Sequence, residues 1–418
     1  MDRAILHSDI NACYASIELL YHPELRGKPF AVCGTQELRH GIVLSKDETA
    51  KRMGVKTGMA IWQAKQCCPE LQTVTPNFDR YMKYSKLIRG IYSEYTDLVE
   101  PFGIDECWLD ITNCLACPDP VKTAHEIRER VKKETGLTVS IGVSWNKILA
   151  KLGSDYKKPD AVTVISRDNF ESLVWPLPAS DMLMVGRSTS RTLERMGIRT
   201  IGELAHTDPR ILKNSLGKCG LMLRSFANGL DSSPVARLGD TPPPQSIGNS
   251  STFPQDIKNT DDAHFAIMTL AECVGTRLRR ENYMCRSIEL SLRDTELNWT
   301  SHRMRLRHPT DITRELTEYG MALFFESHSF PAPLRSMGLR ALELVKNDCP
   351  EQVDIFLDYV NIERQKKLDA AVDRIRLKYG ADSIQRASVF SDPAASGRNI
   401  SILPDHGSSF IRNTSPKG

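Results

Sequence analysis

Three carboxylates stand beside apolar segments of the kind that form strands. Asp9 ends the apolar stretch 4–10, and Asp105 and Glu106 are adjacent within the segment 99–110. An ionised carboxylate is costly to bury unless a cation or a hydrogen-bond donor accompanies it. Divalent metals such as Mg²⁺ take oxygen ligands, and two of them can hold the attacking and leaving oxygens of a phosphoryl transfer. Acids that simply face water at a hairpin edge are the alternative, and the residue types alone leave both open.

These acids need a sheet to bring them together, and the sequence around them predicts one. Strand-like runs alternate with helical stretches through the first 165 residues, which is typical of a mixed α/β domain. Residues 174–234 have a helical pattern, and the three prolines at 242–244 form a semi-rigid linker. Residues 246–345 make another α/β unit. The expected strands of the first domain cover 4–10, 30–33, 42–44, 98–111, 137–143 and 161–165.

The composition sets limits on the class of protein. The 418 residues are 40% hydrophobic and 26% charged, which is a globular composition with enough apolar side chains for several cores. The net charge of +3 excludes a uniformly basic protein but not a local basic face. No apolar run approaches the ~20 residues of a membrane span, and the first residues lack a signal-peptide pattern. The 11 cysteines are scattered, as expected for free thiols in a reducing cytosol. We therefore expect a cytoplasmic protein without a membrane partner.

Three segments in a fixed order carry a more specific signal: His7–Glu18, Phe102–Asp110 and Val143–Pro159. They resemble the catalytic motifs of the Y-family DNA polymerases, the translesion enzymes, and are most similar to the bacterial DNA polymerase IV type. The resemblance implies a multidomain α/β (α+β) fold with a ferredoxin-like palm, fingers, a helix-hairpin-helix thumb and an α/β little finger. The expected bounds are 1–165 for palm and fingers (fingers about 12–76), 166–240 for the thumb, 241–245 for the linker, 246–345 for the little finger and 346–418 for the tail.

The resemblance also implies a reaction and a metal site. Asp9, Asp105 and Glu106 are expected to bind two Mg²⁺ ions, with the backbone carbonyl of Ile10 as a further ligand. In the implied reaction, the primer 3′-oxygen attacks the α-phosphate of a dNTP and releases pyrophosphate. Enzymes of this kind have no proofreading exonuclease, and small fingers imply a roomy, error-prone site.

The resemblance also implies nucleotide contacts, some of which match the family pattern while others depart from it. Tyr14 is expected to be the steric gate, because a planar ring against C2′ leaves no room for a 2′-hydroxyl. Lys158 and Ser45 match positions that contact the triphosphate. The fingers motif departs from the family pattern, since Glu48 replaces a tyrosine and Lys51 replaces an arginine. Lys51 keeps the positive charge but loses the bidentate fork, and an ionised Glu48 cannot donate to phosphate.

Two further patterns point to primer-template DNA. Residues 182–202 resemble a helix-hairpin-helix, in which the free N–H groups after Gly186 form an anion site for one DNA phosphate. Arg303, Arg305 and Arg307 alternate along an expected strand, so they share one face at intervals of about 6.6 Å. This arrangement predicts sequence-independent binding that weakens with salt. A plain helical hairpin and a merely solvated charged face are the alternatives.

The tail combines a candidate peptide motif with a helical pattern. Residues 352–356 resemble the short peptide by which bacterial polymerases dock on the sliding clamp, with Gln352, Ile355 and Phe356 as anchors. A chance match in a loose segment is the alternative. Further on, four apolar residues fall at helical spacing before an expected C-cap at Gly380: Leu368, Val372, Ile375 and Tyr379.

The favoured interpretation is a template-directed, error-prone translesion DNA polymerase that acts as a monomer in the bacterial cytoplasm, in association with the nucleoid. Two other functions stay open. A non-catalytic polymerase-like scaffold would keep the clamp peptide without activity. The intact acids Asp9, Asp105 and Glu106 argue against it, while Glu48 and Lys51 keep it open. A nucleotide cyclase also carries two-metal acids on a palm-like sheet, although the hairpin and arginine patterns argue against it. DNA binding without a cyclic product would exclude the cyclase.

Overall fold

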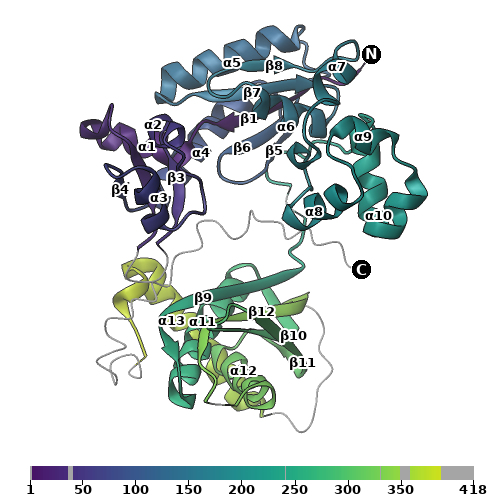
Figure 1. The fold of residues 1–418 in the computed structure, drawn as a ribbon. Coiled ribbons are helices and arrows are strands. Elements are labelled where there is room, and N and C mark those ends of the chain that lie inside the picture. The colour runs from purple at the N-terminus through teal and green to yellow at the C-terminus, as the bar shows by residue number, and fades with distance from the viewer. Residues whose placement is uncertain (1, 36–40, 241, 330, 349–357, 387–418) are drawn as a thin grey trace. The chain divides into compact units, whose positions relative to one another are not determined.

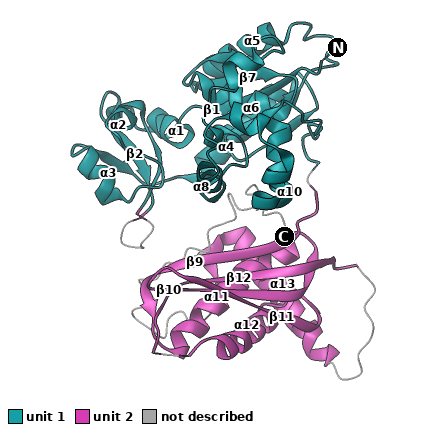
Figure 2. Cartoon of the chain, turned by 45° about the vertical axis from the view of Figure 1, so that its right-hand side comes forward, with its two compact units in different colours: residues 1–34, 42–240, 405–418 teal, residues 35–41, 241–404 magenta. Residues whose placement is uncertain are grey.

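The computed structural model describes residues 2–35, 41–240, 242–329, 331–348 and 358–386 (Figure 1). Two compact units divide the chain, with 2–34 and 42–240 in the first and the described residues from 242 onward in the second (Figure 2). Both units combine sheets with helices, which confirms the predicted α/β fold class. None of the described helices has the length and apolar character that crossing a bilayer requires.

A five-stranded sheet organises the first unit, and three helices cover it. The strands are β1 (Ile5–Ile10), β5 (Val99–Pro101), β6 (Glu106–Asp110), β7 (Val139–Ser144) and β8 (Val162–Val164). The helices are α4 (Phe78–Ser93), α5 (Pro120–Thr135) and α6 (Lys147–Tyr156). The strand order is β5-β6-β1-β7-β8, and every pairing is antiparallel except that of β7 with β8.

Alternation along β1 divides its side chains between the two faces of this sheet. Leu6 and Ile10 join the core formed with α4 and α5, whereas Ile5 packs with Ala150 of α6. Helix α6 lies directly against the sheet at Gly142 of β7, where a Cβ would stand 1.9 Å from the carbonyl oxygen of Ala150. A residue without a side chain is therefore needed at Gly142 to bring α6 close to β1.

A smaller sheet of order β3-β2-β4 forms a second part of the first unit. Its elements are β2 (Phe30–Cys33), β3 (Val43–Lys46), β4 (Gln72–Val74), α1 (Cys13–Tyr21), α2 (Glu48–Arg52) and α3 (Ile61–Cys67). Helix α2 begins at Asp47, whose carboxylate accepts hydrogen bonds from the backbone N–H groups of Thr49 and Ala50. Helix α1 follows β1 directly, and the first strand of the smaller sheet, β2, begins after it at Phe30.

Four helices complete the first unit, and three of them lie between 187 and 227, within the stretch 174–234 for which a helical pattern was expected. They are α7 (Phe170–Val174), α8 (Arg187–Arg195), α9 (Ile201–His206) and α10 (Pro209–Ala227). Helix α9 starts with a capping box, in which Thr200 and Glu203 bond each other's backbone N–H groups. Leu193, Leu204 and Leu212 lie in the core that joins α8, α9 and α10.

The second unit is a four-stranded antiparallel sheet with two helices packed on it. Its elements are β9 (Ser246–Ile257), β10 (Tyr283–Asp294), β11 (Trp299–Thr310), β12 (Leu334–Lys346), α11 (Thr260–Arg280) and α12 (Thr313–Ser327). The strand order is β11-β10-β12-β9. Ile288, Leu290 and Leu292 of β10 are buried in one core with both helices, so one face of the sheet is covered.

A last helix, α13 (Tyr359–Tyr379), docks on the second unit. Arg279 of α11 lies between two of its acids, with Nη1 3.2 Å from Asp369 Oδ2 and Nε 2.6 Å from Asp373 Oδ2. Gly380 forms the C-cap of α13, as its sequence predicted. The spacing in the tail predicted a helix here, and the ion pairs show that this helix belongs to the folded unit.

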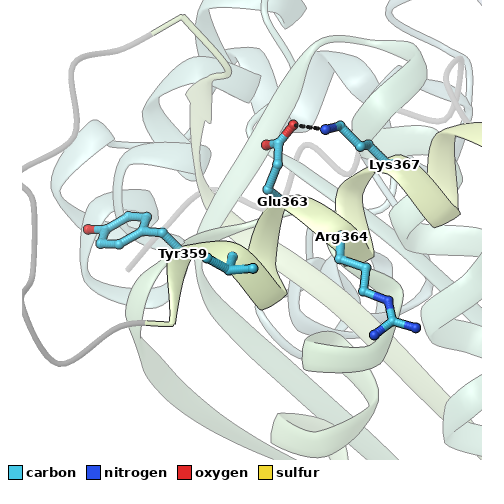
Figure 3. A pocket seen from close by; sticks show the side chains of 5 residues that line it. Tyr359, Glu363, Arg364 and Lys367 are labelled. Carbon is cyan, nitrogen blue, oxygen red and sulfur yellow. Dashed lines mark ion pairs between the residues drawn. The ribbon is translucent and has the colours of Figure 1, made fainter.

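The start of α13 also lines a pocket, to which Tyr359, Glu363, Arg364 and Lys367 contribute (Figure 3). Lys367 pairs with Glu363 at 3.4 Å in this pocket. Every lining residue comes from α13 itself. The pocket is therefore a feature of one helix surface, and the candidate catalytic acids belong to the other unit.

Candidate active site

The strand register sets Asp9 and Glu106 directly opposite each other, on the neighbouring antiparallel strands β1 and β6. Directly opposed side chains point to the same face of a sheet. Asp9 shares the parity of Ile5 along β1, so both acids lie on the face that α6 covers. Asp105 precedes β6, and its backbone carbonyl accepts a hydrogen bond of 3.0 Å from the N–H of Ile10. The three predicted acids thus meet at one end of β1.

Two lysines from α6 and the turn after it hold two of these acids. Lys158 Nζ lies 2.7 Å from Asp9 Oδ2 and 2.7 Å from Asp155 Oδ1. Lys151 Nζ lies 2.5 Å from Glu106 Oε2. The sequence predicted a role for Lys158 but gave none to Lys151. Its available signal was the i,i+4 spacing of Lys151 and Asp155, which puts them on one face of α6.

His7 lies behind Glu106 and is fully buried. Its Nδ1 is 2.8 Å from Ser154 Oγ, and Ser154 donates its own proton to the carbonyl oxygen of Lys151 at 2.7 Å. The other ring nitrogen, His7 Nε2, faces Glu106 Oε2 at 3.3 Å. Burial, together with the nearby Lys151 ammonium, lowers the pKa of His7 to about 3. The neutral ring supplies no positive charge to Glu106, so Lys151 is its cationic partner.

Burial makes the ionised acids of this cluster unfavourable. It raises the pKa of Asp9 to about 6, with Lys158 opposing the rise and Glu106 adding to it. Burial also raises the pKa of Asp105 to about 6, and repulsion from Asp9 and Glu106 contributes. The cluster therefore has more negative charge than the lysines balance.

A divalent cation fits this cluster by the chemistry of its donors, because carboxylate oxygens in a crowded, buried group are what Mg²⁺ prefers. Within the described ranges, no three His, Cys, Asp or Glu side chains already form a ready metal shell. The ammonium of Lys158 instead occupies one Asp9 oxygen. A cation bound between Asp9 and Asp105 would take over the neutralising role that Lys158 now has.

Comparison with known proteins identifies the family of this chain. Residues 8–155 match the impB/mucB/samB family, and residues 244–355 match the C-terminal domain of that family. DNA polymerase IV of Acetivibrio thermocellus is 47% identical over 393 residues, which cover 94% of this chain and 98% of that protein. The chain belongs to the Y-family DNA polymerases, in the polymerase IV group. DNA polymerase IV 1 of Bacillus subtilis is 36% identical over 406 residues, with 96% and 97% of the two chains covered.

A solved structure shows the same Y-family fold. A Y-family DNA polymerase chimera superposes with a TM-score of 0.71 at 22% identity, over 82% of this chain and 100% of the chimera. The palm, fingers, thumb and little finger of that fold account for the two sheets and ten α-helices described in the first unit and for the sheet of the second. The fold expected from the sequence is confirmed.

In this Y-family chain, the predicted gate residue Tyr14 lies on α1, just after β1. Its half-buried ring is stacked on Tyr81 of α4, with ring centroids 4.2 Å apart and an angle of 8° between the planes. Burial, together with the Asp105 carboxylate, raises the pKa of Tyr14 to about 12. The phenol is therefore neutral at physiological pH and lies near the acids.

The other predicted nucleotide contacts lie on the small sheet and its first helix. Ser45 of β3 is buried, and its Oγ accepts a hydrogen bond of 3.3 Å from the N–H of Ala15, next to Tyr14. Lys51 of α2 does not join this group, since its Nζ lies 3.1 Å from Glu48 Oε1. The two residues that depart from the family pattern are thus paired with each other.

The predicted DNA contacts are exposed backbone and side-chain donors. Gly186 is the N-cap of α8, where no side chain caps the helix, so the first N–H groups of α8 have no side-chain acceptor at that cap. Arg303, Arg305 and Arg307 are exposed along β11. Arg303 Nη2 lies 2.5 Å from Glu343 Oε1, so its charge is partly neutralised. The clamp-peptide residues Gln352, Ile355 and Phe356 lie outside the described residues.

Proposed function

We propose that this polymerase extends a primer on a DNA template with dNTPs, in the error-prone manner of translesion synthesis, and that Asp9, Asp105 and Glu106 are its catalytic acids. The observation that carries the assignment is that the register of β1 and β6, together with the hydrogen bond from Ile10 to Asp105, gathers the three acids at one end of the sheet. Family membership supplies the activity, and divalent-metal dependence comes with it. Two Mg²⁺ ions are the proposed occupants, with the Ile10 carbonyl as an added ligand.

Metal ions held by Asp9, Asp105 and Glu106 would supply positive charge to the oxygens that react in the phosphoryl transfer. The chain's own residues do the rest. Lys158 shifts its ammonium from Asp9 to the triphosphate, so the nucleotide receives a positive charge when Asp9 is released for the metal. Lys151 orients Glu106 on the primer side. Tyr14 closes the space beside C2′ and selects deoxyribose, while Ser45 offers a hydroxyl to the phosphates.

The proposed DNA contacts lie in two of the proposed domains, the thumb and the little finger. We assign 1–165 to palm and fingers, 166–240 to the thumb and 246–345 to the little finger. The first turn of α8, after Gly186, binds a phosphate without reading sequence. Arg305 and Arg307 follow the backbone along β11, with Arg303 contributing less because Glu343 holds it.

The proposed partner is inferred from the peptide in the tail, and the proposed location is inferred from the DNA substrate. Gln352, Ile355 and Phe356 dock on a sliding clamp as an extended peptide. The enzyme acts as a monomer in the bacterial cytoplasm, in association with the nucleoid that holds its primer-template substrate.

Primer extension with Mg²⁺ and dNTPs tests the central assignment. Wild type should extend a primer on an undamaged template, and the double variant Asp105→Ala/Glu106→Ala should not, while both bind primer-template DNA equally. Extension by both proteins would remove the acids from catalysis. Extension by neither, with DNA binding retained, would favour the clamp-tethered scaffold. A cyclic nucleotide product made from ATP or GTP would favour the cyclase.

A further inference from the structure

Tyr14 does not stand alone at the nucleotide side of the site, because a second tyrosine lies flat against it. The rings of Tyr14 and Tyr81 are nearly parallel, and Tyr81 has no solvent exposure. Phe78 meets both rings edge-on, with centroids 5.9 Å from Tyr14 and 5.6 Å from Tyr81. Stacked and edge-to-face contacts of this kind stabilise aromatic clusters beyond the burial of their surface. Tyr81 therefore supports one whole face of the Tyr14 ring.

The hydroxyl of Tyr81 fixes that supporting ring. Asn77 donates its backbone N–H to Tyr81 Oη at 3.0 Å, and Tyr81 donates its own proton to Glu18 Oε1 at 2.8 Å. One acceptor and one donor bond at the same atom leave the ring little freedom to tilt or slide. The supporting ring is thus held by hydrogen bonds at its hydroxyl end and by packing over its faces.

Glu18 completes the arrangement from the helix that carries Tyr14. Tyr14 and Glu18 are four residues apart on α1, so they lie on the same side of that helix. Glu18 is fully buried, and its second oxygen lies 2.7 Å from Arg80 Nη1. A buried carboxylate is tolerated only when it is paired and hydrogen-bonded, as Glu18 is by Arg80 and Tyr81. Helix α1 thereby holds both the gate and the anchor of the gate's support.

Exclusion of a 2′-hydroxyl by contact requires a ring that cannot retreat. If the Tyr14 ring could recoil by about the radius of an oxygen atom, a ribonucleotide would fit. We propose that Tyr81, anchored by Glu18, prevents this recoil and so sets how strictly the enzyme rejects ribonucleoside triphosphates. Tyr81 and Glu18 are positioning residues in this inference, which rests on the proposed role of Tyr14 as the gate.

Single-nucleotide incorporation measures the effect, as the ratio of kcat/KM for a dNTP to that for the matching rNTP. Tyr81→Leu removes the flat support, and the ratio should fall about tenfold, which corresponds to about 1.4 kcal/mol of lost discrimination. Tyr81→Phe and Glu18→Gln weaken only the anchor, so the ratio should fall less. In each variant the change should come from faster rNTP use, with dNTP use nearly unchanged.

Tyr92→Phe is the matched control. Tyr92 is also buried on α4, and Tyr92→Phe loses a comparable hydrogen bond, the one between the Tyr92 hydroxyl and Ser8 Oγ at 2.7 Å. The Tyr92 ring has no contact with Tyr14 among the ring pairs of the described residues. Its ratio should equal that of wild type. A fall as large as in Tyr81→Phe would mean that any loosening of α4 has this effect, and would overturn the specific role of Tyr81.

Tyr14→Ala separates this inference from the gate assignment. If Tyr14→Ala leaves rNTP rejection intact, the gate assignment itself is wrong. If Tyr14→Ala admits rNTPs but Tyr81→Leu, Tyr81→Phe and Glu18→Gln do not, the gate stands and the supporting role is overturned. Should Tyr81→Leu fail to fold, the two conservative variants decide the question.

Discussion

Lys158 Nζ lies 2.7 Å from Asp9 Oδ2, although the two residues are 149 positions apart in the chain. The cis peptide bond between Lys158 and Pro159 directly follows this contact. Burial makes the negative charge of Asp9 unfavourable, and the Lys158 ammonium group balances part of that charge. A divalent cation at Asp9 would compete for the same oxygen, so metal binding and the position of Lys158 are coupled.

We expect the stabilisation by Mg²⁺ to depend on pH. Burial raises the pKa values of Asp9 and Asp105 to about 6, above the ordinary value of about 4. Between these pH values the folded state holds protons that the unfolded state has released, so metal-free stability falls as pH rises from about 4 to about 6. Mg²⁺ relieves the repulsion only once the acids are ionised. Thermal unfolding should therefore show a larger Mg²⁺-induced rise in Tm at pH 7.5 than at pH 5.

The control for this experiment is Asp9→Asn/Asp105→Asn, which removes both titrating groups. Its metal-free Tm should vary less between pH 4 and pH 6, and Mg²⁺ should have little effect at either pH. An equal Mg²⁺ shift in the variant and the wild type would place the metal away from these acids.

Lys151→Met should reduce turnover by about 10- to 100-fold, the usual range for losing a residue that orients a metal ligand. The reason is that Glu106 would lose its cationic partner, since the neutral His7 cannot replace Lys151. Lys151→Arg should recover much of the activity because it keeps the charge. The Mg²⁺ concentration for half-maximal rate should also change, which a purely structural role would not produce. Lys122→Met, on the exposed surface of α5, is the control and should behave as wild type.

DNA affinity should depend on salt through β11. Each phosphate contact contributes about 0.9 to the slope of log K against log salt. Arg305→Ala and Arg307→Ala should each remove nearly one phosphate contact, so each should reduce the magnitude of that slope by about 0.9. The reduction should be the same for every DNA sequence. Arg303→Ala should have a smaller effect because Glu343 already binds its guanidinium. Fluorescence anisotropy across a salt series measures the slopes, and identical slopes in all variants would exclude β11 from the DNA interface.

Arg279→Met should loosen α13. Arg279 is largely buried between Asp369 and Asp373, and removing one partner of a buried ion pair costs about 3–5 kcal/mol. The exchange rates of the α13 backbone amides measure this loss of stability at the helix itself. The measurement therefore does not depend on the stability of the first unit. Arg314→Met is the matched control, because its pair with Glu318 is exposed to solvent and contributes little to stability. Unchanged α13 protection in Arg279→Met would show that other contacts hold the helix.

The sequence was enough to predict the elements near the acids but not the pairs between distant segments. The strand ending at Asp9 and the segment around Asp105 and Glu106 have strong local patterns, and the structure has β1 and β6 there. The contact of Lys151 with Glu106 depends on how closely α6 approaches the sheet at Gly142, which is a packing property. No local pattern encodes such a distance.

The same limit applies to the aromatic support and to the tail. Tyr81 follows Tyr14 by 67 positions, and only the crossing of α1 and α4 stacks their rings. Spacing predicted a helix near 368–379, but its docking needs Arg279 on another helix. The assignment of Tyr14, Ser45 and Lys158 came from resemblance to a family, since their residue types alone are common on surfaces.

The pairing of Glu48 with Lys51 has a consequence for amino-acid substitutions at these two positions of α2. The two departures from the common tyrosine-and-arginine pattern neutralise each other, so neither is independent. An arginine introduced first at 51 would still be drawn to Glu48, and a tyrosine introduced first at 48 would release a lysine toward the nucleotide. The benefit of each substitution thus depends on the other, and the two orders of mutation pass through different intermediates. We therefore expect the effects of substitutions at 48 and 51 to be non-additive.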